Sequence, residues 1–236
     1  MGTSGSYKGG VGGAWTPYKR AASAYARYGG PERAGAALAA FVAALGGVAG
    51  ALAAAQPGLS AGGGLGQLLA ASAVDGSLSA GVGAVGLGDL VGGTRIELLS
   101  ALLDRFTGDG ASLNDQAARS AMVDTLNDLL PDGDDALPLD DVHLDEAAVR
   151  ALIEKYLALL IYNLAAPIID ERLNRLGDLA VAAERNRELQ DYILALVRLA
   201  AAQMNPLTVD WSGEEGQRIL RTVLEAVYEQ LDAEDH

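Results

Sequence analysis

The acidic stretch from residue 131 to 144, PDGDDALPLDDVHL, has the residue types that bind a hard cation. Its aspartates supply the carboxylate oxygens that Ca²⁺ and Mg²⁺ prefer. The ligand order of an EF-hand loop is missing, because no Gly stands at the sixth position and no Glu at the twelfth. His143 has no cysteine or second histidine nearby, and no partnered serine that would indicate a catalytic triad. We therefore expect a solvated acidic linker without a metal site.

Glycines in the middle of the chain match nucleotide-binding motifs only in part. Gly62, Gly64 and Gly66 are not followed by the Gly-Lys-Ser/Thr of a P-loop. The run Gly81-x-Gly83-x-x-Gly86 fits the letters of the dinucleotide fingerprint. No convincing strand precedes it, and no alternation of strands and helices surrounds it. We interpret both patterns as consequences of a Gly-rich composition.

Paired carboxylates are the other arrangement that could act on a substrate. Glu184 and Glu188 stand four apart, but on an exposed charged helix face such pairs are solvated far more often than catalytic. The chain has no cysteine, which excludes disulfides and thiolate metal sites. We expect a protein that is not an enzyme and needs no cofactor. A hydrolase that uses carboxylates alone is the enzymatic alternative that the sequence leaves open.

Apolar residues recur at steps of three and four, which predicts an all-α fold, an irregular multi-helix bundle. The widest stripe runs from Asp145 to Leu164, so this helix is expected at the centre of the core, with Asp145 as its N-cap and Pro167 ending it. Capping boxes are expected at Ser112 and Ser212. Further helices are expected over residues 17–28, 32–55, 94–106, 112–130, 168–176, 178–204 and 212–231.

Four ranges describe the expected organisation of the chain. Residues 1–15 form a flexible Gly-rich N-terminal arm, residues 16–130 an Ala/Gly-rich helical region, residues 131–144 an acidic linker, and residues 145–236 a C-terminal helical bundle. Residues 131–236 packing with 16–130 as one domain is the alternative. Within the middle, the Gly-rich region 57–93 is expected to form flexible loops around short helices at 65–71 and 87–91.

Charge is unevenly distributed along the 236 residues, whose formal net charge is −14. Residues 1–60 hold five basic residues and one acidic residue, whereas residues 61–236 hold 12 basic and 30 acidic residues. The acidic body makes nucleic acid an unlikely general partner, since neutralising phosphates requires clustered Lys and Arg. The basic first part can contact an acidic partner or the acidic body of the chain itself.

The segment from residue 34 to 74 contains no charged residue and is long enough to cross a membrane. Ala and Gly partition weakly into lipid compared with Leu and Ile, so a tightly packed helix is expected here, with Gly46 and Gly50 allowing close contact. A membrane-perturbing effector that uses residues 34–74 is the alternative function.

The chain opens with MGTSGSYKGGVGGAW, which is polar and Gly-rich and does not resemble a secretory signal. We expect a cytoplasmic protein. The small Gly2 favours removal of Met1, which leaves an unhindered glycine amine. Gly2 and Ser6 also fit an N-myristoylation pattern, which Gly- and Ser-rich segments produce by chance.

The opening MGTSGSY and the following Tyr/Arg segment resemble QatB, the B component of the Qat anti-phage defence system. A similar order continues in the central helix around Leu157 and Leu160, and in the link 207–211 followed by Gly216, Gln217 and Arg218. The likeness is best over the first seven residues. The Pro-rich spacer and additional basic residues of QatB-like chains are nearly absent here, which puts in doubt whether the chain serves the same operon or a related one.

The resemblance implies a non-enzymatic component of a bacterial immune system, encoded with an ATPase, a QueC-like enzyme and a TatD-like nuclease. A QueC-like enzyme uses ATP to activate the carboxylate of a deazaguanine. The resemblance therefore implies Gly2 as the acceptor of an N-terminal 7-deazaguanine. Partner recognition would fall to the neighbouring residues Thr3, Ser4, Gly5, Ser6 and Tyr7, and the protein would act as a scaffold or sensor.

Overall fold

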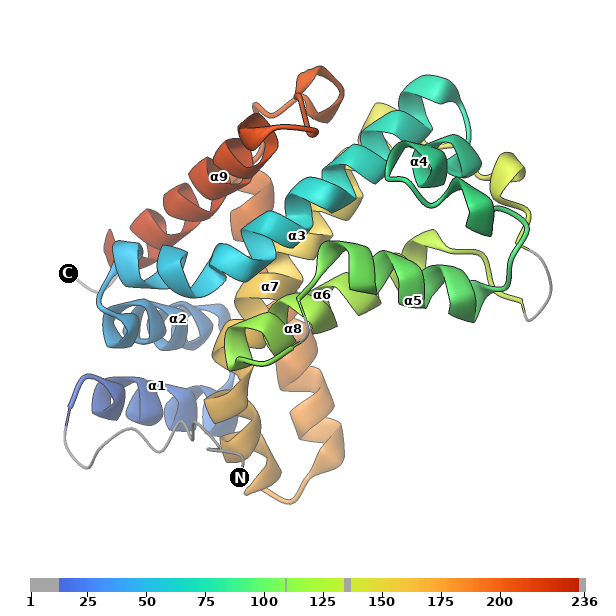
Figure 1. Cartoon of the computed structure of the whole chain (residues 1–236). Coiled ribbons are helices and arrows are strands. Elements are labelled where there is room, and N and C mark those ends of the chain that lie inside the picture. The colour runs from blue at the N-terminus through green and yellow to red at the C-terminus, as the bar shows by residue number, and fades with distance from the viewer. Residues whose placement is uncertain (1–12, 109, 134–136, 234–236) are drawn as a thin grey trace. The chain divides into compact units, whose positions relative to one another are not determined.

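The computed structural model describes residues 13–108, 110–133 and 137–233. The regular secondary structure in this part of the chain consists of helices, with no strand (Figure 1). The expected all-α class is confirmed. The α-helices are α1 (Trp15–Tyr28), α2 (Pro31–Leu45), α3 (Val48–Asp75), α4 (Leu78–Ala84), α5 (Arg95–Phe106), α6 (Leu113–Leu129), α7 (Glu146–Asn174), α8 (Leu179–Ala200) and α9 (Glu214–Ala233). Three 3₁₀ turns are η1 (Gly88–Leu90), η2 (Leu139–Asp141) and η3 (Pro206–Thr208).

The helices form two compact units. The first consists of the residues up to Ala51, Ala165–Tyr192 and the residues from Tyr228 onward; the second consists of Leu52–Leu164 and Ile193–Val227. Helices α3, α7, α8 and α9 each contribute residues to both units. The boundaries expected from sequence at residues 15, 130 and 144 stay predictions about how the chain folds.

The elements with the clearest local signals form as expected. Thr94 caps α5 with Glu97, and Ser112 caps α6 with Asp115, each pair forming a reciprocal capping box. The amide of Ala148 donates to Asp145, the expected N-cap of α7. Most of the expected central stripe of α7 is fully buried, including Val149, Ile153, Tyr156, Leu157, Leu160, Ile161 and Leu164.

Two expected helix ends are wrong because proline sits inside a helix in the structure. Helix α7 does not stop before Pro167; it absorbs the expected helix 168–176 and continues to Asn174. Helix α3 likewise runs through Pro57. A proline removes one hydrogen bond and strains one turn, but packing along a helix of this length outweighs that local cost.

The Gly-rich region 57–93, which was expected to form flexible loops, is largely helical. The expected helix 32–55 is broken at Gly46 and Gly47, which adopt φ +98° and +80°, and α3 then continues through the glycines to Asp75. Gly46 therefore ends α2 as its left-handed C-cap and does not mediate a helix contact with Gly50. One 3₁₀ turn, η1, replaces the expected helix 87–91.

A row of glycines on α3 explains how this segment packs as a helix. Gly58, Gly62 and Gly66 recur every four residues and therefore share one face of the helix. In the second unit, a Cβ at Gly62 would lie 2.7 Å from Cδ1 of Leu220 and 2.9 Å from Cε1 of Tyr156. A Cβ at Gly58 would overlap the side chain of Leu160. Hydrogen at these positions lets large side chains from α7 and α9 reach the α3 backbone.

Trp211 completes the same packing. Its ring lies against Gly66 of α3 and Gly216 of α9, and its Nε1–H donates to the carbonyl of Pro206 at 2.7 Å. Trp211 is buried, at 5% exposure. The expected capping box of Ser212 and Glu215 is wrong: the Glu215 carboxylate accepts from the Asp210 amide, and Ser212 donates to Asp210.

Three leucine or isoleucine side chains on these helices are exposed. Ile96, Leu179 and Leu199 are 77%, 83% and 66% exposed. Ile96 and Leu179 lie in the first turn of their helices, where the neighbouring turn that would cover them is missing. Leu98 takes the place of Ile96 in the buried face of α5.

Among the described residues, α7 is the one helix long and apolar enough to cross a membrane, and 67% of its most apolar window is buried inside the protein. The pair α2 and α3 would qualify only if it formed a single span, and the two helices are bent sharply at their break. Most Leu and Phe side chains of residues 34–74 are buried. Membrane perturbation by this segment stays a prediction, which partition into liposomes tests.

Candidate functional site

The predicted site residues Gly2, Thr3, Ser4, Gly5, Ser6 and Tyr7 lie outside the described residues. The structure describes the chain from Gly13 onward and begins α1 at Trp15. The described part of the candidate site is therefore the helix that follows the N-terminal segment, together with what holds that helix in place.

Helix α1 is fixed within the first unit by buried tyrosines. Tyr18, Ala22 and Tyr25 share its buried face. The Tyr18 hydroxyl donates to the carbonyl of Ala165, and the Tyr25 hydroxyl donates to that of Arg185. The Tyr18 ring also packs on Phe41 of α2, with ring centroids 5.5 Å apart. These contacts bind α1 to three separate stretches of the chain.

The turn after α1 is locked by a charged contact with α8. Gly29 adopts φ +62°, and the Arg185 guanidinium occupies the space that a Cβ would fill. The Gly30 amide donates to Glu188 at 2.8 Å, and Arg185 pairs with the same carboxylate at 3.1 Å. Glu188 is therefore a structural residue, and the solvated role expected for it is wrong.

A second polar contact in this unit joins α7 to α8. The amide of Asn186 donates to Asp170 at 3.2 Å. Burial raises the pKa of the Asp170 carboxyl, because the charged form loses hydration, and the Asn186 hydrogen bond offsets only part of this effect. No sequence pattern distinguished Asp170 from the other carboxylates.

The acidic stretch is bound to the second unit and is not a free linker. Leu137 and Leu139 are buried, and the amide of Leu78 donates to the carbonyl of Val142 at 3.0 Å. Asp140 accepts a hydrogen bond from Ser79, and Nδ1 of His143 contacts the carbonyl of Gly76. In the described ranges, no three His, Asp or Glu side chains are placed to hold a metal ion.

Gly81 and Gly83 of the dinucleotide-like pattern belong to the short helix α4, and Gly86 follows its end. A Cβ at Gly81 would overlap Ser72 and the carbonyl of Leu68, both on α3. Gly81 is thus a close-packing position, which supports the interpretation of the pattern as fortuitous.

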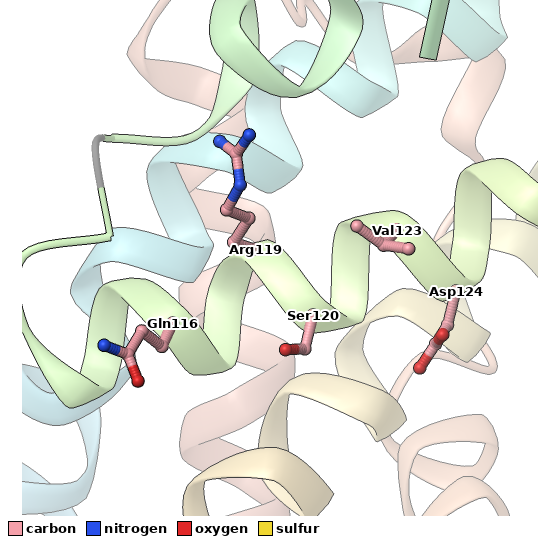
Figure 2. Close-up of a pocket in the computed structure, with 5 residues that line it drawn as sticks. All are labelled: Gln116, Arg119, Ser120, Val123 and Asp124. Atoms are coloured by element: carbon pink, nitrogen blue, oxygen red, sulfur yellow. The ribbon is translucent and has the colours of Figure 1, made fainter. Parts of the chain in front are cut away.

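An open hollow of about 500 Å³ lies along α6, lined by Gln116, Arg119, Ser120, Val123 and Asp124 (Figure 2). All five come from one face of a single helix. The Arg119 guanidinium donates to Thr107 at 3.0 Å and to Asp104 at 3.3 Å, so it joins α6 to α5. The lining holds no nucleophile paired with a base, and the hollow offers no set of groups for catalysis.

The corner between α1 and α2 carries an arrangement that sequence reasoning only touched on. The Tyr28 ring is 60% exposed. Two guanidinium carbons lie over it, that of Arg27 at 5.9 Å and that of Arg33 at 5.4 Å from the ring centroid. The Tyr/Arg composition of residues 18–28 was the available signal, but Arg33 lies beyond the helix break and enters only through the fold.

Comparison with known proteins gives one family and no individual relative. No curated protein and no solved structure matches the chain. A family model described as "Qat anti-phage system associated protein QatB" matches residues 46–231, which covers α3 to α8 and most of α9 but not α1, α2 or the N-terminal segment. The expected resemblance is thereby confirmed, and the chain belongs to the QatB family and is a component of the Qat anti-phage system.

Proposed function

We propose that this protein is a non-enzymatic, cytoplasmic component of its defence system whose N-terminal Gly2 receives a 7-deazaguanine from a QueC-like partner. The single observation that carries the proposal is the opening MGTSGSY, in which a glycine amine follows a removable Met1 and precedes small, unhindered residues. Membership of the QatB family supports the defence context but does not extend to these residues, because the match begins at residue 46.

The chemistry requires one new bond. The Gly2 amine attacks the activated carboxyl carbon of the deazaguanine, the activating group that ATP supplied leaves with its electron pair, and an amide forms as the amine loses a proton. The adduct therefore weighs the sum of protein and deazaguanine acid less one water. An α-amine has an ordinary pKa of about 7.7–8.0, so a minority of it is the unprotonated nucleophile near neutral pH.

Anchoring of α1 supports a presenting role. The segment from Gly2 to Trp15 can reach at most about 45 Å when fully extended. Its base is held by buried hydrogen bonds from Tyr18 and Tyr25. A short segment on a fixed base raises the local concentration of Gly2 near any protein bound to this unit. We propose that the modified terminus is then displayed to the other components of the system, an ATPase and a TatD-like nuclease.

Intact mass and N-terminal peptide sequencing of the protein co-expressed with its gene neighbours test this proposal. We expect the added mass on Gly2, and its loss in Gly2→Pro and when the QueC-like neighbour is omitted. Gly10→Pro, which leaves the terminal amine unchanged, is the matched control and should retain the adduct. An unmodified glycine terminus beside an active neighbour, or retained Met1, contradicts the proposal.

A further inference from the structure

We propose that the exposed side of the α1–α2 corner, formed by Arg20, Arg27, Tyr28 and Arg33 and called the basic face below, is the docking surface for an acidic surface of a partner protein. The proposal goes beyond the proposed function and does not depend on Gly2 or its modification. It rests on charge, on the absence of ion pairs at these residues, and on the geometry of the guanidinium groups.

Charge separates this corner from the rest of the chain. The first acidic residue of the sequence is Glu32, so α1 carries Lys19, Arg20 and Arg27 without any carboxylate. The remainder of the chain is strongly acidic. The basic face therefore has a positive local potential although the net charge of the molecule is negative, and such a potential attracts an acidic surface.

The cations of this corner form no ion pair with any described residue. Ion pairs engage eight other basic side chains among the described residues, such as Arg119 with Asp104, Lys155 with Asp128 and Arg185 with Glu188. Lys19, Arg20, Arg27 and Arg33 are absent from these pairs even though the chain has nearly twice as many acidic as basic residues. Arg20, Arg27 and Arg33 are all exposed.

The guanidinium geometry favours carboxylates as the ligand. Arg27 and Arg33 both lie over the Tyr28 ring, and Arg33 also donates to the carbonyl of Gly29 at 3.1 Å. The planar guanidinium carries its N–H donors in a fixed fork that matches a carboxylate by a bidentate contact. The cation–π contacts with Tyr28 also limit the side-chain entropy that docking would cost.

The same geometry disfavours nucleic acid. A nucleobase would have to compete with the Arg27 and Arg33 guanidiniums for the ring of Tyr28. A long polyanion would also meet the repulsion of a chain with a net charge of −14. An acidic patch on a protein presents its carboxylates locally and avoids most of that repulsion, and QatB membership supplies a system with partner proteins.

Fluorescence anisotropy of the full chain with labelled probes tests the basic face. The probes are an oligo-glutamate peptide, an oligo-thymidine of equal length and phosphatidylglycerol vesicles. We expect the peptide to bind, to weaken as salt rises from about 50 to about 300 mM, and to lose affinity by about tenfold in Arg20→Glu/Arg27→Glu. Arg187→Glu/Arg221→Glu changes the net charge equally at exposed arginines elsewhere and should keep the affinity within about twofold.

Arg20→Gln/Arg27→Gln, which introduces no repulsion and spares the Arg33 contact to Gly29, repeats the test should the charge reversal unfold the protein. Absence of peptide binding, an equal loss in the control variant, or tighter binding of the oligonucleotide or the vesicles would overturn the proposal.

Discussion

Replacing Gly66 by alanine tests whether the glycines of α3 are packing positions. A Cβ there would lie 2.6 Å from Cζ3 of Trp211 and closer still to Cδ2 and Cε3. The ring cannot move away easily, since its other contact is Gly216 and its Nε1–H is bound to Pro206. Overpacking of this kind costs about 1–3 kcal/mol. Alanine regains about 1 kcal/mol over glycine in a helix interior.

We therefore expect Gly66→Ala to lower the free energy of unfolding by up to about 2 kcal/mol, the overpacking cost less the propensity gain. Gly63, three residues earlier on the same helix, is the matched control. A Cβ there would meet only the flexible Gln217 side chain, with Cγ at 3.4 Å. Gly63→Ala should raise stability by up to about 1 kcal/mol, since it gains helix propensity without a clash.

Urea unfolding of the full chain, followed by circular dichroism, measures both variants under the same conditions. A double variant with Trp211→Ala, which removes the whole indole ring, should cost less than the sum of the two single changes, because the clash disappears. If Gly66→Ala and Gly63→Ala were equally stable, the packing explanation for these glycines would be refuted.

Two further predictions concern buried polar groups. Tyr156→Phe should lower the free energy of unfolding by about 1 kcal/mol, because the Tyr156 hydroxyl donates to the carbonyl of Gly58 at 2.8 Å. Tyr228→Phe should be neutral or stabilising, since the buried Tyr228 hydroxyl has no partner among the described residues. A larger loss of stability in Tyr228→Phe than in Tyr156→Phe, measured by urea unfolding, would contradict this. Burial raises the pKa of Asp170 above its ordinary value of 3.8, so the folded state retains the proton longer than the unfolded chain. The stabilisation that the protonated Asp170 carboxyl contributes is complete below the pKa of the unfolded state and is lost as pH rises through the pKa of the folded state. Asp170→Asn should therefore match the parent at acid pH and exceed it at neutral pH, while the exposed Asp191→Asn changes little; a parent more stable than Asp170→Asn at neutral pH would refute the cause assigned to the shift.

The sequence predicted those elements whose signals are local. The capping box at Ser112 begins α6 as expected, because a cap depends on side chains within four residues of itself, and α5 lies within the expected range 94–106. The central helix was found because its apolar stripe is wide. Its end was misplaced since Pro167 acts locally, whereas the burial of Ile168 and Ile169 beyond it depends on the tertiary fold.

The prediction for the Gly-rich region was wrong for the same reason. Glycine lowers helix propensity, so a local reading of residues 57–75 predicts loops. The three glycines at 58, 62 and 66 face Leu160, Tyr156, Leu220 and Trp211, which lie about 100 to 160 positions further along the chain. Only their spacing of four, which is the spacing of one helix face, carried the information. The basic face was missed likewise, because Arg33 joins Tyr28 across a helix break.

A variant that begins at Gly13 separates folding from the proposed display of the N-terminus. The anchors of α1 include the Tyr18 and Tyr25 hydroxyls and the amide of Gly30, all beyond residue 13. Removing residues 1–12 should therefore change the free energy of unfolding by no more than about 0.5 kcal/mol. Gly29→Ala, which forces a side chain into a left-handed turn against Arg185, is the positive control and should destabilise clearly.

The truncated protein should also bind the oligo-glutamate peptide like the parent, because the basic face lies entirely beyond residue 13, while it loses the adduct expected on Gly2. A marked loss of stability on truncation would mean that residues 1–12 belong to the folded core. The segment would then be a structural part of the first unit, and its glycine amine would be a poor acceptor, since a modifying enzyme reaches only a terminus that the fold leaves accessible.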